Sequence, residues 1–231
     1  MHMKKMMFLL AMASLSTAVG MAQDKSQGKI DYEVTLNVRA SMKPDQQQYK
    51  DLVPEKVVNK EVLYFNGSKA RLSRKDPDEI TSDEGAKVKI VTNDGQIAVY
   101  TDAATGQSWS LQEANGKKTL IPMEKGYKAV GKASISVDSA KIETGKRTKE
   151  ILGFPCREMV IKSKEMGEMT LWVTDALPLR AGPMGFSSDK GLVLGVDNKK
   201  LNVIATAITY SPVSLGEVTP PADVPVMSDK K

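Results

Sequence analysis

Apolar and polar residues alternate along most of this chain, and the alternation starts close to its beginning. In residues 28–38, GKIDYEVTLNV, apolar side chains occupy every second position from Ile30 to Val38. Successive side chains of a β-strand point to opposite faces, so a period of two places these residues on one face. We therefore expect a strand with one buried face.

Turn dipeptides separate further alternating segments in the first half of the chain. Asn66-Gly67 lies between two of them, and Asp94-Gly95, Thr105-Gly106 and Asn115-Gly116 follow. Asn-Gly and Asp-Gly favour two-residue hairpin turns, because both residues of such turns need positive φ. Turn signals about 8–12 residues apart predict an antiparallel meander.

The second half repeats this pattern. Residues 140–153 predict two short strands, and residues 157–175 predict a hairpin that turns at 164–167. Another hairpin is expected where the segment 192–197 turns at Asn198 into 201–213.

These elements predict a mainly β fold. Helical composition appears at Asp45–Leu52, between Pro44 and Pro54, which predicts one short helix. We expect a single curved antiparallel sheet, either an open half-barrel or a sandwich-like arrangement, with one or two short helices. A sheet of this length covers its apolar face by curling, by stacking or with the helical pieces.

The first 22 residues have the pattern of a Sec signal peptide. Lys4 and Lys5 precede an apolar stretch, and small residues lead to a cleavage site near Ala22-Gln23. No cysteine lies directly after the apolar stretch, so we expect a periplasmic or secreted protein that is not a lipoprotein. No later segment reaches the ~20 apolar residues of a membrane-spanning helix.

The chain after the signal peptide shows no linker that would divide it. We expect one β-rich domain over residues 23–218 and a flexible C-terminal tail over 219–231, TPPADVPVMSDKK, which is rich in proline and charge.

Histidine is missing from the predicted mature chain, because the single histidine, His2, lies in the signal peptide. This excludes Ser-His-Asp and Cys-His catalysis and zinc sites that use imidazole. The net charge of +5 comes from basic residues interspersed with acids, which argues against a nucleic-acid surface. We expect no catalytic residue, no metal and no cofactor.

Cys156 is the only cysteine of the chain. Free cysteines are among the most buried residues, and a buried thiol is protected in an oxidising compartment. We therefore expect Cys156 to have a structural role. A redox-active thiol and an intermolecular disulfide are the alternatives.

Two groups of residues could offer soft or hard metal ligands. The methionines 159, 166, 169 and 184 are close in sequence, and acidic residues gather at 76–84. Met166 and Met169 would point to opposite faces of a strand, and the acidic run lacks the spacing of a calcium loop. We expect core packing for the methionines and a solvated loop for the acids.

The loop 176–191, ALPLRAGPMGFSSDKG, is long and dense in turn residues. Its apolar residues Met184 and Phe186 suggest that it either folds back over the core or contacts a ligand. The residues for which we expect a structural role here and in the preceding hairpin are Gly153, Pro178, Gly182, Pro183 and Gly191.

The segments ILGFPC (151–156), LWVTDALPLRAGPMGF (171–186) and GLVLGV (191–196) together resemble the C-terminal half of the GLPGLI family. These are exported proteins of Bacteroidetes. The chain departs from the family at its namesake, where Ser188–Val193 reads SDKGLV. A sister family with a lipoprotein-carrier-like fold is the alternative. The resemblance implies a β-rich periplasmic or outer-membrane-associated protein and no catalytic residue.

The function expected from these observations is binding. A curved sheet too wide to be filled by its own side chains could hold a lipid or an acylated peptide, with the loop 176–191 as a lid. One alternative is a structural protein that docks on an outer-membrane partner, and another is an enzyme that uses carboxylates alone. The candidate ligand-binding residues are Tyr32, Leu63, Phe65, Trp172, Met184 and Phe186.

Overall fold

The computed structural model describes residues 24–74, 80–81, 87–88, 95–123, 128–130, 133–135, 141–163 and 167–227. The predicted signal peptide and most of the acidic run at 76–84 lie outside this part of the chain.

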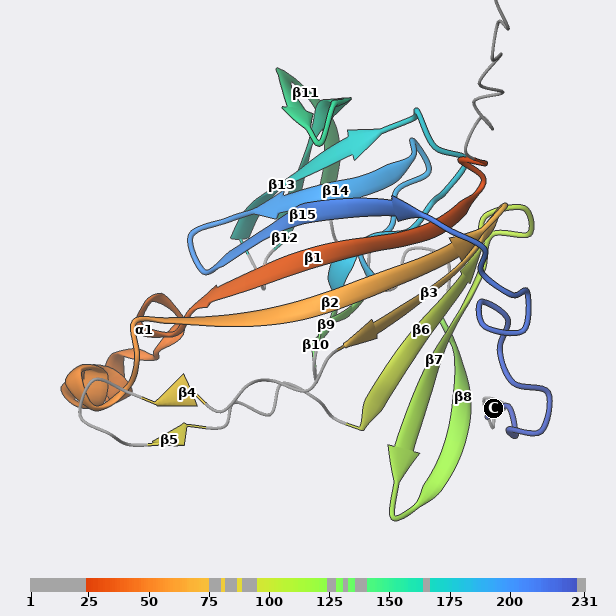
Figure 1. The fold of residues 1–231 in the computed structure, drawn as a ribbon. Helices are drawn as coiled ribbons and strands as arrows, with labels where there is room; N and C mark the ends of the chain where they lie inside the picture. The colour runs from red at the N-terminus through yellow and green to blue at the C-terminus, as the bar shows by residue number, and fades with distance from the viewer. Residues whose placement is uncertain are drawn as a thin grey trace, which may run out of the picture.

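The fold is mainly β, as the alternation predicts. Eleven strands form one antiparallel sheet that does not close on itself, in the order β11-β12-β13-β14-β15-β1-β2-β3-β6-β7-β8, and Figure 1 shows its strong twist. The strands are β1 (Gln27–Asn37), β2 (Lys56–Asn66), β3 (Lys69–Arg74), β6 (Gln96–Asp102), β7 (Gln107–Ala114), β8 (Lys117–Met123), β11 (Lys141–Ile151), β12 (Phe154–Ser163), β13 (Gly167–Thr174), β14 (Leu192–Asp197) and β15 (Leu201–Tyr210).

Short elements complete the fold. The described helical segments are α1 (Val38–Ser41), η1 (Pro44–Leu52) and η3 (Pro183–Gly185). The predicted short helix is η1, which is a 3₁₀-helix. Two further sheets have two strands each and are not hydrogen-bonded to the main sheet. They pair β4 (Ile80–Thr81) with β5 (Lys87–Val88), and β9 (Lys128–Val130) with β10 (Ala133–Ile135). No helix among the described residues is both long and apolar enough to cross a membrane.

Three of the hairpins predicted from turn dipeptides are present, at Asn66-Gly67, Thr105-Gly106 and Asn115-Gly116, whereas Asp94 of the remaining turn lies outside the described residues. Gly67 has φ +59° in the turn between β2 and β3, where Asn66 pairs with Lys69. Asn115 and Gly116 have φ +53° and +71° between β7 and β8, which is the left-handed pair that an Asn-Gly turn supplies.

The expectation of two short strands in residues 140–153 is wrong, because β11 is one strand with a bulge. Its pairing with β12 shifts register between Thr144 and Thr148. Gly145 lies in this bulge, and a Cβ there would come within 2.2 Å of the Glu158 carboxylate. The bulge breaks the alternation of side chains, so the segment looks like two strands in the sequence.

Strand β1 lies inside the sheet, between β2 and β15. Gly28 pairs with Tyr210 on one side and with Phe65 on the other. The two ends of the domain therefore meet in adjacent strands, which Figure 1 shows as β1 and β15 running side by side.

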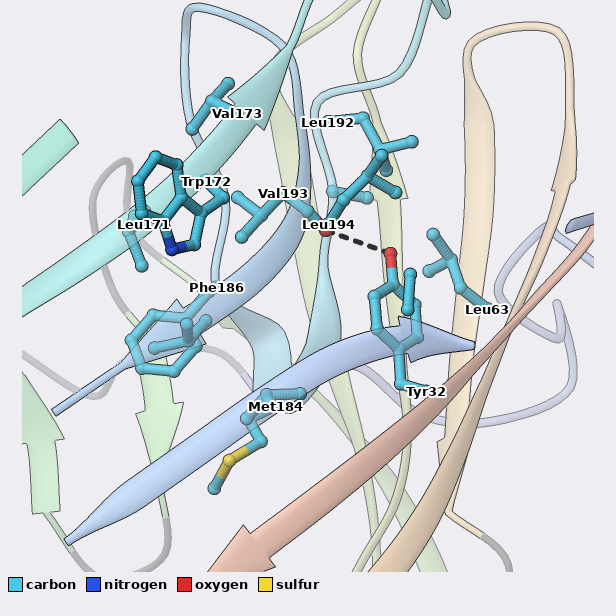
Figure 2. Close-up of a cluster of buried hydrophobic side chains, with 14 of the residues drawn as sticks. Tyr32, Leu63, Leu171, Trp172, Val173, Met184, Phe186, Leu192, Val193 and Leu194 are labelled. Atoms are coloured by element: carbon cyan, nitrogen blue, oxygen red, sulfur yellow. Dashed lines mark hydrogen bonds between the residues drawn. The ribbon is translucent and has the colours of Figure 1, made fainter. Parts of the chain in front are cut away.

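The main hydrophobic core lies on one face of β1, β2 and β3 and is covered by β14 and the loop 176–191. Figure 2 shows Tyr32, Leu63, Met184 and Phe186 in this cluster. The Tyr32 hydroxyl donates to the carbonyl of Val193 over 2.9 Å. These contacts join the two halves of the sheet across the core, which makes the arrangement sandwich-like.

A second, smaller core lies on the opposite face of β6, β7 and β8. Its buried residues are Ala98, Tyr100, Leu111 and Leu120. Val99 belongs to the main core, so neighbouring residues of β6 serve opposite faces. This strand is apolar on both sides.

The C-terminal segment covers part of this second core. The described part of the predicted tail 219–231, up to Met227, forms backbone hydrogen bonds with β8. The Leu120 N–H donates to the carbonyl of Pro225 over 2.9 Å, and the Met227 N–H donates to the carbonyl of Leu120 over 2.8 Å. Backbone hydrogen bonds of this kind leave no signal in side-chain composition.

Candidate functional site

A groove of about 500 Å³ lies between β6–β8 and the C-terminal segment. Its floor is the face of the sheet that carries the second core. Its far wall is formed by residues 218–226. The groove therefore lies outside the main core, on the opposite side of the sheet.

Two aromatic residues form the centre of the floor. Tyr100 of β6 and Trp109 of β7 are direct cross-strand partners, and Pro122 of β8 is the next partner of Trp109. Cross-strand partners place their side chains next to each other on one face. Tyr100 is buried and Trp109 is partly exposed, so the indole offers the accessible aromatic surface.

A polar row runs beside the aromatic pair. Lys69 of β3, Asp102 of β6 and Gln107 of β7 are successive cross-strand partners and line the same groove. The Lys69 ammonium donates to the Asp102 carboxylate over 2.6 Å, while Gln107 is exposed. The groove therefore has one apolar row and one hydrogen-bonding row.

Asp102 is held in its ionised form. Burial acts to raise the pKa of this carboxyl, but hydrogen bonds from Lys69, the Ala104 N–H and Ser68 outweigh it, and the pKa is lowered. The Ala104 N–H and the Ser68 hydroxyl lie 3.0 and 3.1 Å from the carboxylate. An ionised, fully engaged carboxylate suits hydrogen-bond acceptance and not proton donation.

A second neutralised cation, on β3, lies next to Glu217, the residue directly before the far wall. Arg71 forms an ion pair with Glu217 at 3.2 Å and lies 5.0 Å from the ring centroid of Tyr64. Val218, the next residue after Glu217, is 1% exposed and anchors the wall. Because Lys69 and Arg71 both have carboxylate partners, these pairs add no net charge to the groove.

The predicted ligand-binding residues lie elsewhere, all in the main core cluster. None of the six lines the groove, and none is more than 7% exposed. A small void of about 10 Å³ lies beside Leu63, Leu72 and Phe186, which is about the space of one water molecule. In the structure these side chains pack on one another; the six are Tyr32, Leu63, Phe65, Trp172, Met184 and Phe186.

Trp172 has a polar environment at one edge of the core. Its indole N–H donates to Asp197 over 2.7 Å. Arg147 and Lys149, both on β11, lie 5.5 Å from its ring centroid. Arg147 also pairs with Glu158 through its guanidinium and its backbone N–H, so the β11 bulge is fastened to β12.

Cys156 has no exposed surface, as we expect for a thiol with a structural role. Burial raises the pKa of the thiol to about 11. A thiol with this pKa holds almost no thiolate at neutral pH, and the thiolate is the reactive form. The location therefore gives no support to a redox role.

The three glycines singled out in the sequence occupy positions where a side chain would be strained or would clash. Gly153 has φ +80° in the β11–β12 turn. A Cβ on Gly182 would lie 2.6 Å from the Val193 Cβ, and one on Gly191 would lie 2.1 Å from the Thr174 carbonyl oxygen. Pro183 is buried in η3, and Pro178 is exposed.

An enzyme that uses carboxylates alone would need two of them in one cleft, so the position of each buried carboxylate matters. Glu61 lies in the main core and accepts from the Met184 N–H over 2.6 Å, whereas Asp102 lies in the groove and Glu158 beneath Arg147. The Arg147 hydrogen bond lowers the pKa of Glu158. Among the described residues, no cluster of three or more His, Cys, Asp or Glu could hold a metal.

The groove was missed from the sequence, although one signal for it was present. Tyr100 and Trp109 lie in alternating segments on either side of the Thr105-Gly106 turn. A hairpin closed at this turn pairs Asp102 with Gln107 and therefore Tyr100 with Trp109. The wall at 218–226 had no such signal.

Comparison with known proteins identifies relatives of this fold. The family model described as "N-glycanase peptide, N-terminal domain" matches residues 119–214. No curated protein matches the sequence.

Two solved structures of PNGF-II, in space groups C2 and P21, are similar to this chain. Their sequence identities are 14% and 15% and their TM-scores 0.57 and 0.53. The alignments cover 88% and 87% of this chain but 31% and 32% of the PNGF-II chains. This chain thus shares a fold with about a third of PNGF-II.

Proposed function

We propose that this chain is an exported, non-catalytic binding module that holds a saccharide in the groove over β6–β8. The observation that carries the proposal is the Tyr100–Trp109 pair beside the row Lys69–Asp102–Gln107. The proposal of export rests on the signal-peptide pattern of residues 1–22.

A saccharide suits the two rows because a pyranose ring is amphipathic. Its C–H groups form an apolar face that can stack on the partly exposed indole of Trp109, as apolar groups do on aromatic rings. Its hydroxyls lie at the rim, within reach of polar side chains such as Gln107 and Lys69. A few polar groups in a mostly apolar groove are the usual basis of orientation and specificity.

The charge of the groove favours a neutral saccharide. Both cations near the site, Lys69 and Arg71, already have carboxylate partners at 2.6 and 3.2 Å. An acidic sugar would gain less from cations that carboxylates already neutralise than from unpaired ones.

The comparisons are consistent with this class of ligand. The matching family is named after an N-glycanase. A binding module of this fold would bring a carbohydrate chain close to an enzyme that processes it. Membership of the GLPGLI family stays a prediction from the sequence.

The carrier hypothesis requires more rearrangement than the groove does. A lipid or acylated peptide on the main-core face of β1–β3 would have to displace Met184 and Phe186, which are 7% and 0% exposed. A ligand in the groove would displace neither Met184 nor Phe186, because neither side chain lines it. We therefore place the ligand in the groove.

Docking on a partner protein, including one of the outer membrane, is a second candidate function. It is favoured by the exposed large apolar side chains Tyr49, Leu52 and Val58, which are 52%, 62% and 45% exposed. They lie on η1 and the start of β2. Exposed apolar side chains of this size are common in contacts between proteins.

Intrinsic fluorescence tests the saccharide proposal, because the chain has two tryptophans. Titration with a neutral N-glycan released from glycoprotein, and with mannobiose and cellobiose, should change the emission of partly exposed Trp109. The Trp109→Ala variant should lose the change and at least ~10-fold in affinity. Trp172→Phe, the control, should keep both. Absence of binding at millimolar ligand, or equal binding by Trp109→Ala, would refute the proposal.

A further inference from the structure

The C-terminal segment that walls the groove is attached unequally along its length. Its first part is held by three polar contacts. The Asn66 amide donates to the carbonyl of Val213 over 2.7 Å, the Val213 N–H donates to Gln27 over 3.0 Å, and Glu217 pairs with Arg71 at 3.2 Å. Val218 then inserts into the protein with 1% exposure. This part is fixed.

The second part, residues 219–227, is held mainly by a single β-bridge. Its backbone hydrogen bonds to the sheet both involve Leu120, at 2.9 and 2.8 Å. Val224 packs against the second core, whereas Val226 and Met227 are 55% and 54% exposed. We call residues 219–227 the strap.

The strap lies along the outer edge of β8. β8 is the last strand of the sheet order, and Leu120 directs its N–H and C=O away from β7. In an antiparallel pair the outward direction recurs at every second residue, so it returns at Lys118 and at Pro122, and Pro122 has no N–H. Among the described residues, the strap is bridged to this edge at one point, between Val226 and Leu120.

A two-bond attachment with exposed ends is the kind of contact that opens locally without global unfolding. Strap residues Thr219, Pro220, Pro221, Val224 and Val226 line the groove. Release at Leu120 would therefore remove the far wall while the Val218 anchor stays in place.

We propose that the strap opens at Leu120 to admit the ligand and closes over it again, with the hinge directly after Val218. The identity of the ligand rests on the proposed function, but the opening itself does not. The strap would control the rates at which ligand enters and leaves.

Hydrogen exchange of the free, full-length protein tests the opening. The Leu120 amide is bonded to the strap, while the amides of Thr119 and Ile121 face β7 by the alternation of the antiparallel pair. We expect the Leu120 amide to exchange at least ~10-fold faster than its two neighbours. Equal exchange at all three residues would show that the strap is a permanent part of the sheet and would overturn the proposal.

A pair of variants at Met227 tests the role of the bridge. Met227→Pro removes the N–H that bonds Leu120, and Met227→Ala keeps it while shortening an exposed side chain. We expect Met227→Pro alone to accelerate Leu120 exchange, and to raise both association and dissociation rates of a saccharide that binds in the fluorescence titration. Unchanged Leu120 exchange in Met227→Pro would overturn the proposal. Lack of any saccharide binding with fast Leu120 exchange would refute only the proposed function.

Discussion

The substitution Phe186→Ala tests whether the loop 176–191 is part of the core or a loosely attached lid. Its side chain has no exposed surface and packs in the main cluster. Replacement of a buried phenylalanine by alanine removes its transfer free energy and leaves a cavity, which together cost about 3–5 kcal/mol. A domain of this size loses about 2–4 °C in Tm per kcal/mol, so Phe186→Ala should lower Tm by roughly 6–20 °C.

Thermal unfolding followed by circular dichroism, with urea unfolding for the free energy, measures this loss. Asp189→Ala in the same loop is the control, because the Asp189 side chain is 70% exposed. A surface change of this kind should stay within about 0.5 kcal/mol. If Phe186→Ala cost less than about 1 kcal/mol, the loop would not contribute to the core as the structure indicates, and a lid over a ligand cavity would become the better explanation.

Three further outcomes follow from individual contacts. Tyr32→Phe removes the hydrogen bond to the Val193 carbonyl and should lower the free energy of unfolding in urea by about 1 kcal/mol. An unchanged free energy of unfolding would show that this hydrogen bond does not stabilise the fold. Cys156, whose thiol pKa is raised to about 11, should resist a thiol reagent at pH 8 until the protein is unfolded, and rapid labelling of the folded protein would contradict this. Arg147 lowers the pKa of Glu158 below 4.5, so this pair stabilises the fold above pH 4.5 and the effect is lost as pH falls through the lowered pKa. The difference in Tm between wild type and Glu158→Gln should therefore shrink below pH 4.5, and a constant difference across pH would argue against the pair.

Much of the strand content could be predicted because side-chain alternation is a local property. The alternation from Ile30 onward and the turns at Asn66-Gly67 and Asn115-Gly116 each depend on a few neighbouring residues. The bulge at Gly145 could not be predicted, because the groups that it contacts belong to Glu158 on the next strand. Strand order is equally non-local, as the pairing of β1 with β15 shows.

The site was harder to predict than the fold. The sequence analysis chose large apolar residues such as Phe65 and Phe186, and these fill the main core. The groove depends on the register that joins Tyr100 to Trp109 and on a C-terminal segment whose attachment is made by backbone atoms. Composition identifies neither of these.

The central place of β1 determines when the chain can finish folding. Gly28 needs Tyr210 as its partner, so the interior strand that is synthesised early has one open edge until the last strand emerges. Pairings between such distant segments slow folding, because a long loop must close before they form. A nascent chain of this protein would thus stay without its complete native sheet until Tyr210 has left the ribosome.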